Sequence, residues 1–169
     1  MLEVVMHKGF TLVELIVTIA VIAILAVIAA PSMSSWLKNN KIKTTQGDIA
    51  HFLNEARSNA IKSGKRIEIC ASSDDQLTCA DTEKTEWSKG IIARQINSTA
   101  PNDTVVISKI EFNDTRLSVQ APAVLSFNNV GAAYDVYTIT VSMIDQIKLS
   151  VCVGIAGHIE RRAGDNCEE

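Results

Sequence analysis

Signatures of catalysis and of cofactor binding are missing from this chain of 169 residues. It has no Gly-x-Ser-x-Gly, no phosphate-binding glycine loop and no His-Glu-x-x-His, patterns that position a nucleophile, a phosphate or a metal. It also has no Cys-x-x-Cys pair, and His51 and His158 do not stand at metal-ligand spacing. We therefore expect a protein that is not an enzyme and that holds no cofactor and no metal.

Aromatic residues and net charge are scarce as well. Phe, Trp and Tyr make up 5% of the chain, too few for a platform on which bases stack. The formal net charge is −3, so the chain as a whole does not attract nucleic acid. Any DNA binding would have to come from a local basic patch. No internal repeat, low-complexity tract or second globular domain is evident.

One long apolar run is present, from Phe10 to Ala30, and its only charged side chain is Glu14. At about 1.5 Å per residue a helix of this length spans roughly 31 Å, close to the hydrocarbon thickness of a bilayer. A carboxylate at the bilayer midplane costs roughly 2.5–3.5 kcal/mol. No basic residue in the run can neutralise Glu14, so we expect its partner to come from outside the run.

The residues around this acid resemble a known processing site. Residues 8–15, KGFTLVEL, resemble the leader-cleavage site of type IV pilins and pseudopilins. The resemblance implies that a prepilin peptidase cuts between Gly9 and Phe10, that Phe10 is then N-methylated, and that Glu14 helps to dock subunits in a filament. The charges agree with this, because cleavage gives Phe10 an ammonium with which Glu14 of a neighbouring subunit can pair. Residues 1–9 are then a cleaved leader, and 10–30 the transmembrane and filament-core helix.

Two simpler interpretations compete. A secretory signal peptide cut near Ala30 would have an unusually long apolar region that contains Glu14. An ordinary membrane anchor is the other, and the lysines at 38, 41 and 43 bear on its orientation. The positive-inside rule, applied to these lysines, would place the C-terminal part in the cytoplasm. The cysteines and the leader motif favour export, so we expect a single-pass inner-membrane protein with its C-terminal domain, residues 31–169, in the periplasm.

The chain has four cysteines, an even number that indicates two disulfides in an exported domain. Three pairings are possible. Proximity favours Cys70–Cys79 and Cys152–Cys167, since each closes a loop of roughly 10–16 residues worth about 3 kcal/mol in a chain-entropy estimate.

Hydrophobic periodicity predicts an α+β fold. Apolar residues recur at helical spacing beyond Pro31 and the pattern ends at Ser63-Gly64, so we expect one helix over about 10–62 whose second half is amphipathic. Period-two patterns follow. The expected strands are 66–70, 87–96, 104–112, 117–127, 134–143 and 146–153. A helix followed by strands gives the α+β class. The resemblance to type IV pilins implies the finer architecture, one long N-terminal helix packed on antiparallel sheets.

Motifs in the remaining two thirds resemble one subgroup. These motifs are FLNEARSNA at 52–60, WSKG at 87–90, FNNVG at 127–131 and the late Gly157 before Cys167. They are similar to the GspH/FimT group of minor pilins and pseudopilins, which includes FimU. The resemblance implies a place in the tip complex of a type IV pilus or of a type II secretion pseudopilus. The implied partners are other minor and major pilin subunits, the prepilin peptidase and the inner-membrane assembly platform.

A basic pair near the C-terminus raises a different function. Some FimT proteins bind DNA for natural transformation through a Gly-Arg-x-Arg motif in this region. Here His158 and Glu160 stand where those arginines would fall, and only Arg161 and Arg162 remain to substitute. Glu160 repels phosphate, and successive strand residues point to opposite faces. We therefore rank DNA binding below a role in assembly.

Overall fold

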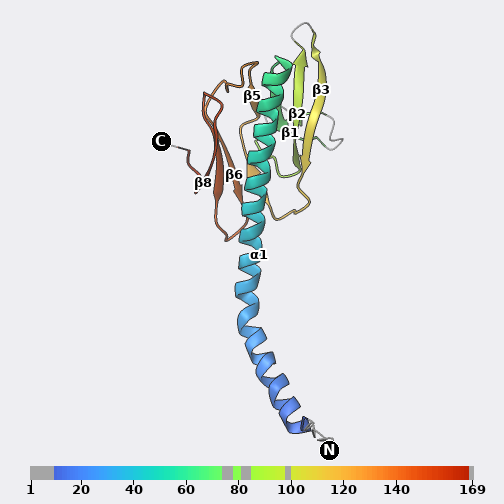
Figure 1. Cartoon of the computed structure of the whole chain (residues 1–169), viewed down its shortest axis with the longest axis vertical. Helices are drawn as coiled ribbons and strands as arrows, with labels where there is room; N and C mark the ends of the chain where they lie inside the picture. The colour runs from blue at the N-terminus through green and yellow to red at the C-terminus, as the bar shows by residue number, and fades with distance from the viewer. Residues whose placement is uncertain (1–9, 74–77, 81–84, 98–99, 168–169) are drawn as a thin grey trace, which may run out of the picture. The chain divides into compact units, whose positions relative to one another are not determined.

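The computed structural model describes residues 10–73, 78–80, 85–97 and 100–167. The expected leader, with Gly9 at its end, lies outside the described residues. The chain divides into two compact units, Met1–Leu37 and Lys38–Glu169, which are described separately. Among the described residues, one helix is followed by eight strands. This arrangement, visible in Figure 1, is the α+β class that the sequence predicts.

The helix α1 spans Leu12–Ser63, close to the predicted 10–62. Its start is fixed by Thr11, whose Oγ1 accepts a hydrogen bond from the backbone N–H of Glu14 at 3.2 Å. Thr11 with Glu14 three residues later has the sequence of a capping box. The helix ends where Gly64 adopts a φ of 65°, a left-handed conformation that glycine takes without a steric penalty.

In the first unit, α1 exposes apolar side chains on all sides. The large exposed ones before residue 38 are Phe10, Leu12, Val13, Leu15, Ile16, Val17, Ile19, Val21, Ile22, Ile24, Leu25, Val27, Ile28, Met33, Trp36 and Leu37. No single straight helix among the described residues meets the length and hydropathy of a membrane span, but the segments Leu12–Ile28 and Ser32–Ser63, taken together as a bent pair, do. An apolar surface that surrounds a helix requires a bilayer or partner helices around it.

The second unit contains two antiparallel sheets. The first has the strand order β3-β2-β1-β5, and the second has the order β4-β6-β7-β8. Their strands are β1 (Ile67–Ala71), β2 (Gly90–Asn97), β3 (Ala100–Glu111), β4 (Ser118–Gln120), β5 (Val124–Phe127), β6 (Tyr137–Ser142), β7 (Leu149–Val153) and β8 (Ile159–Ala163). The second half of α1 lies across both sheets (Figure 1).

The amphipathic half of α1 supplies one wall of the core. Its buried residues recur at helical spacing, namely Ile42, Ile49, Phe52, Leu53, Ala56 and Ala60. They pack with the inward residues of both sheets in one continuous cluster that includes Trp87, which is fully buried. The role expected for the apolar stripe is therefore confirmed.

The strands differ from the prediction in two places. The expected strand 117–127 is divided into β4 and β5, which belong to different sheets. Pro122 stands in the break, and a proline has no N–H to donate to a ladder. The strand β8 was not among the expected strands, because its sequence, IERRA, shows no apolar alternation.

Candidate functional site

Glu14 lies in the first turn of α1 with its side chain exposed. Among the described residues, no ion pair or side-chain hydrogen bond of its carboxylate is found. Phe10, four residues earlier, is 82% exposed. A carboxylate in this position is favoured by the helix dipole and is available to a group from another molecule.

Two side chains on the second half of α1, Gln46 and Arg57, tie the helix to the second sheet and to nearby turns. The side chain of Gln46 is buried, and its Nε2 donates to the carbonyl oxygens of Ser150 at 2.7 Å and of Arg162 at 2.9 Å. Ser150 and Arg162 are direct partners across β7 and β8. One amide therefore joins the helix to two strands, and a buried amide that donates twice avoids the free-energy cost of an unmade hydrogen bond.

Arg57 makes a similar link eleven residues later, at the far end of the domain. Its Nε donates to the carbonyl oxygen of Gly131 at 2.8 Å, and its Nη2 donates to that of Ala156 at 3.2 Å. Gly131 belongs to the turn between β5 and β6, and Ala156 to the turn between β7 and β8. The FLNEARSNA motif was noted in the sequence, but this contact was not foreseen because it depends on the register of two distant turns.

Two glycines allow these turns to approach each other. Gly157 has a φ of 77°, and a Cβ there would lie 1.9 Å from the carbonyl oxygen of Gly131. Gly131 has a φ of 79°, and a Cβ there would lie 2.6 Å from Cδ1 of Ile61. Both positions therefore favour glycine for their conformation. At Gly157 a backbone oxygen also leaves no space for a Cβ, whereas at Gly131 the nearest atoms belong to the side chain of Ile61. The contact between these two turns gives a structural role to the glycine of FNNVG and to the late Gly157.

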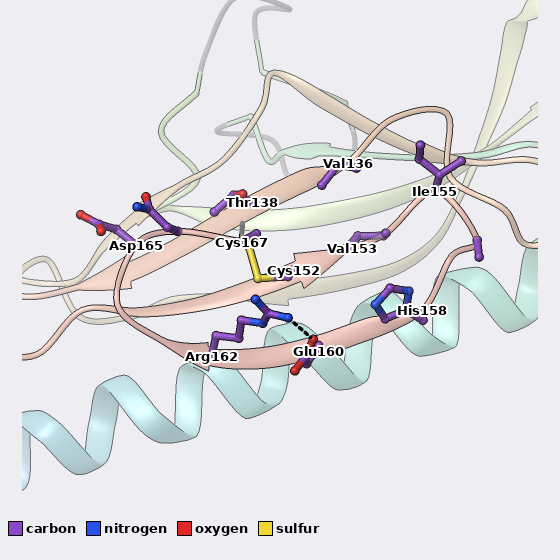
Figure 2. Close-up of a pocket in the computed structure, with 13 residues that line it drawn as sticks. Val136, Thr138, Cys152, Val153, Ile155, His158, Glu160, Arg162, Asp165 and Cys167 are labelled. Atoms are coloured by element: carbon purple, nitrogen blue, oxygen red, sulfur yellow. Dashed lines mark hydrogen bonds and ion pairs between the residues drawn. A yellow bond between two sulfur atoms is a disulfide. The ribbon is translucent and has the colours of Figure 1, made fainter. Parts of the chain in front are cut away.

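The cysteines form two disulfides, Cys70–Cys79 and Cys152–Cys167. The first joins β1 to the loop that follows it. The second joins β7 to the C-terminal segment, where Oγ of Ser150 also donates to the carbonyl oxygen of Gly164 at 2.6 Å. Figure 2 shows the second disulfide beside a pocket of about 800 Å³ on the outer face of β6, β7 and β8. His158, Glu160 and Arg162 are the charged or titratable side chains of β8 and its preceding turn that line the pocket.

The DNA candidates Arg161 and Arg162 point to opposite faces of β8. Nη2 of Arg162 pairs with Oε2 of Glu160 at 3.0 Å on the outer face (Figure 2). Arg161 lies on the face of β8 that is turned toward α1. Its Nη1 would be 3.6 Å from a Cβ placed on Gly47 of that helix. The structure therefore does not bring the two guanidinium groups together as one phosphate clamp.

The part of the chain that the structure describes contains no candidate metal centre. No three His, Cys, Asp or Glu side chains there could hold a metal ion together. Among the described carboxyls, Asp114 has a displaced pKa, which falls from 3.8 to about 2 because Arg116 donates hydrogen bonds to it. This pair lies at the surface and has the character of a local loop contact.

Comparison with protein families gives two matches. The family described as type II transport protein GspH matches residues 46–157, and the prokaryotic N-terminal methylation motif matches residues 6–30. No curated protein sequence matches the chain. The methylation motif implies a chain anchored in a membrane by its N-terminal helix.

Solved structures with the same fold include two crystal forms of the type IV minor pilin FimU of Pseudomonas aeruginosa. The first is 18% identical with a TM-score of 0.59, over 79% of this chain and 99% of that one. The second is 17% identical with a TM-score of 0.56, over 75% and 99%. The minor pseudopilin EpsH from the Type 2 Secretion System of Vibrio cholerae is 12% identical with a TM-score of 0.53, over 72% and 95%. At these identities the likeness shows the fold.

Proposed function

Because this chain belongs to the GspH family of type II transport proteins, we propose that it is a non-enzymatic minor subunit of a type IV pilus that acts in a tip or priming complex. The fold, the methylation motif and the family agree on a pilin or pseudopilin. The finer role, at the tip and in priming, is our inference.

The observation that carries the proposal is the first part of α1. It is apolar on all sides, it has one acid, and that acid has no partner among the described residues. In the bilayer, lipid covers this surface. In a filament, the helices of neighbouring subunits would cover it, and Glu14 would pair with the N-terminal amine of Phe10 of a neighbour.

The same proposal assigns the remaining parts. A prepilin peptidase removes residues 1–9 and methylates Phe10, residues 10–30 hold the chain in the inner membrane, and residues 31–169 form the periplasmic domain. Two disulfides are typical of a protein in an oxidising compartment, and they support a periplasmic location for this domain. The assembly platform of the inner membrane would then pass the subunit to other minor and major pilins.

A type II secretion pseudopilin is the second candidate, and the likeness to EpsH together with the family's description favours it. DNA uptake has less support, because Arg162 pairs with Glu160 and Arg161 points to the other face of β8. A protein that must hold a duplex needs several cations on one surface.

A deletion strain tests the proposal and separates the two leading candidates. We expect loss of surface filaments with normal protein secretion, restored by the intact gene. Loss of secretion with normal filaments would move the chain to the secretion system. A strain that keeps both would contradict an assembly role.

A further inference from the structure

The end of the domain that contains Lys38 carries both exposed isoleucines and several basic residues. The strand β7 runs in the same direction as α1, because Gln46 bonds to Ser150 whereas Arg57 bonds to Ala156. The hairpin 143–148, which precedes β7, therefore lies toward the first residue of the domain, Lys38. Figure 1 shows this hairpin below β6, beside α1.

The hairpin presents apolar side chains at its tip. Ile144 is 83% exposed, the highest value among the large apolar side chains that the structure describes, and Ile147 is 37% exposed. Between them, Asp145 has a φ of 59°, and the backbone N–H of Gln146 donates to the carbonyl oxygen of Met143 at 3.2 Å. The turn is therefore held by a backbone hydrogen bond, and it exposes the side chain of Ile144 to the surroundings.

Several basic side chains lie at the same end of the domain as the hairpin. No ion pair is found within the described residues for Lys38, Lys41, Lys43 or Arg161. Lys43 and Arg161 line a shared shallow depression of about 390 Å³, together with the start of β7 and the end of β8. Lys41 lies on the side of α1 that faces Asp114, but Asp114 is already paired with Arg116 at 2.9 Å.

Acidic groups at this end are fewer, and most are paired. Asp165 pairs with Lys148 at 3.2 Å, and Glu160 with Arg162 at 3.0 Å. Asp48, Asp145 and Glu86 remain as exposed acids, and Glu86 accepts hydrogen bonds from Ser88 and Gln120. The formal net charge is −3 for the whole chain and −1 for residues 1–37, so it is −2 for the domain. The positive charge at this end is therefore opposite in sign to the net charge of the domain.

We propose that this end of the domain docks on the surface of the bilayer through the phosphate headgroups of anionic phospholipids, with Ile144 and Ile147 entering the interface. The proposal rests on the membrane anchor of the proposed function. Lipid is favoured as the occupant because the cations begin directly beyond the apolar run. Trp36 is 58% exposed, and tryptophan prefers the membrane interface. In the sequence, Lys38, Lys41 and Lys43 follow Trp36 within seven residues. A negative surface potential acts on cations that stand this close to the end of a membrane segment.

Such docking gives a function to lysines that contradict the positive-inside rule. An anionic surface attracts the basic end and repels the rest of an acidic domain, so the domain is held in one orientation before assembly. Extraction of the subunit into a filament would break these contacts.

Hydrogen exchange of the full chain in lipid nanodiscs tests the proposal. Discs of phosphatidylcholine alone are compared with discs that also contain phosphatidylglycerol. We expect the amides of residues 143–148 to exchange about tenfold more slowly in the anionic discs. Residues 128–133, in the turn at the other end of the domain, should exchange equally in both.

Variants identify the groups that act. The triple variant Lys41→Gln, Lys43→Gln, Arg161→Gln should lose the lipid-dependent protection, and Ile144→Ser should weaken it. Lys62→Gln, an exposed lysine in the last turn of α1, should leave it unchanged. Unaltered exchange in the core strands shows that each variant is folded.

If the amides of residues 143–148 exchange at equal rates in the two bilayers, the proposal is wrong. The basic residues would then be available to bind an acidic protein surface instead. Protection that survives in the triple variant also overturns the proposal. Failure of the assembly role is distinct, since a deletion strain with normal filaments and normal secretion would leave lipid docking intact.

Discussion

At the scale of single residues, the fold depends on a contact between two turns that are far apart in the sequence. Gly157 meets the carbonyl oxygen of Gly131, and Arg57 donates a hydrogen bond to the same oxygen. The sequence showed these residues as motifs but could not show that they meet, because the meeting depends on strand register. Glu14 was identifiable from the sequence, because an acid in an apolar run is conspicuous whatever the fold.

Replacement of Gly157 by alanine should be strongly destabilising. The new Cβ is strained by the left-handed φ and clashes with a backbone oxygen that cannot move aside. We therefore expect the free energy of unfolding to fall by about 2–4 kcal/mol. Urea unfolding of the domain measures it. Gly64→Ala is the matched control, because Gly64 has a similar φ of 65° but no atom within 4 Å of a Cβ, and it should cost about 1 kcal/mol. Equal losses at the two positions would show that the close contact is unimportant.

Arg161 and Arg162 decide between assembly and DNA uptake. We expect residues 32–169 to show negligible binding to a short DNA duplex at roughly 0.15 M salt, where screening is strong. Two separated arginines on a net acidic domain give too little attraction. Micromolar binding that Arg161→Ala and Arg162→Ala abolish would contradict this and make the uptake receptor the leading account.

At the scale of elements, the helix was predicted more accurately than the strands. Period 3.6 in the apolar residues and a terminal glycine located α1 to within two residues at its start. The strands were located approximately, since period two marks a half-buried strand but not its sheet. Pro122 separated β4 from β5, and β8 was missed because a polar edge strand carries little periodic signal. The disulfide partners lie at short separations of 9 and 15 residues, which is why proximity indicated them.

The helix is held on the domain by Arg57 as well as by apolar contact. Arg57→Met keeps most of the apolar stem but removes both hydrogen bonds, and we expect it to destabilise the domain by about 1.5–3 kcal/mol. Lys62→Met, also on α1, should change stability by less than about 0.5 kcal/mol. Urea unfolding compares them. A loss no larger for Arg57→Met than for Lys62→Met would refute the bridging role.

At the scale of the whole molecule, the two units match two different surroundings. The described side chains of residues 10–28 and 32–37 expose a largely apolar surface, whereas residues after Leu37 enclose a core between a helix and two sheets. The first unit requires lipid or partner helices, and the second is a compact domain with its own disulfides. The class and the family could be inferred from the sequence, but the partners could not, because a single chain does not contain the surfaces it meets.

Processing should leave a shorter chain with a modified first residue. Mass spectrometry of the protein from membranes should find a chain that begins at methylated Phe10, and Gly9→Val should block the cleavage. The recovery of intact residues 1–9 from cells that contain an active peptidase would rule out this maturation.

The central claim, that this chain is an assembly subunit docked by Glu14, is tested most directly by its amount in filaments. Chromosomal Glu14→Ala and Glu55→Ala variants are compared with the parent strain by quantitative mass spectrometry of purified filaments and of membranes. Glu55 is an exposed carboxylate on the same helix, within the folded domain. We expect Glu14→Ala to reduce the filament fraction by about tenfold or more, because the loss of one partner of a buried pair costs about 3–5 kcal/mol. Its membrane level, and both levels of Glu55→Ala, should stay normal. Normal incorporation of Glu14→Ala would contradict the account.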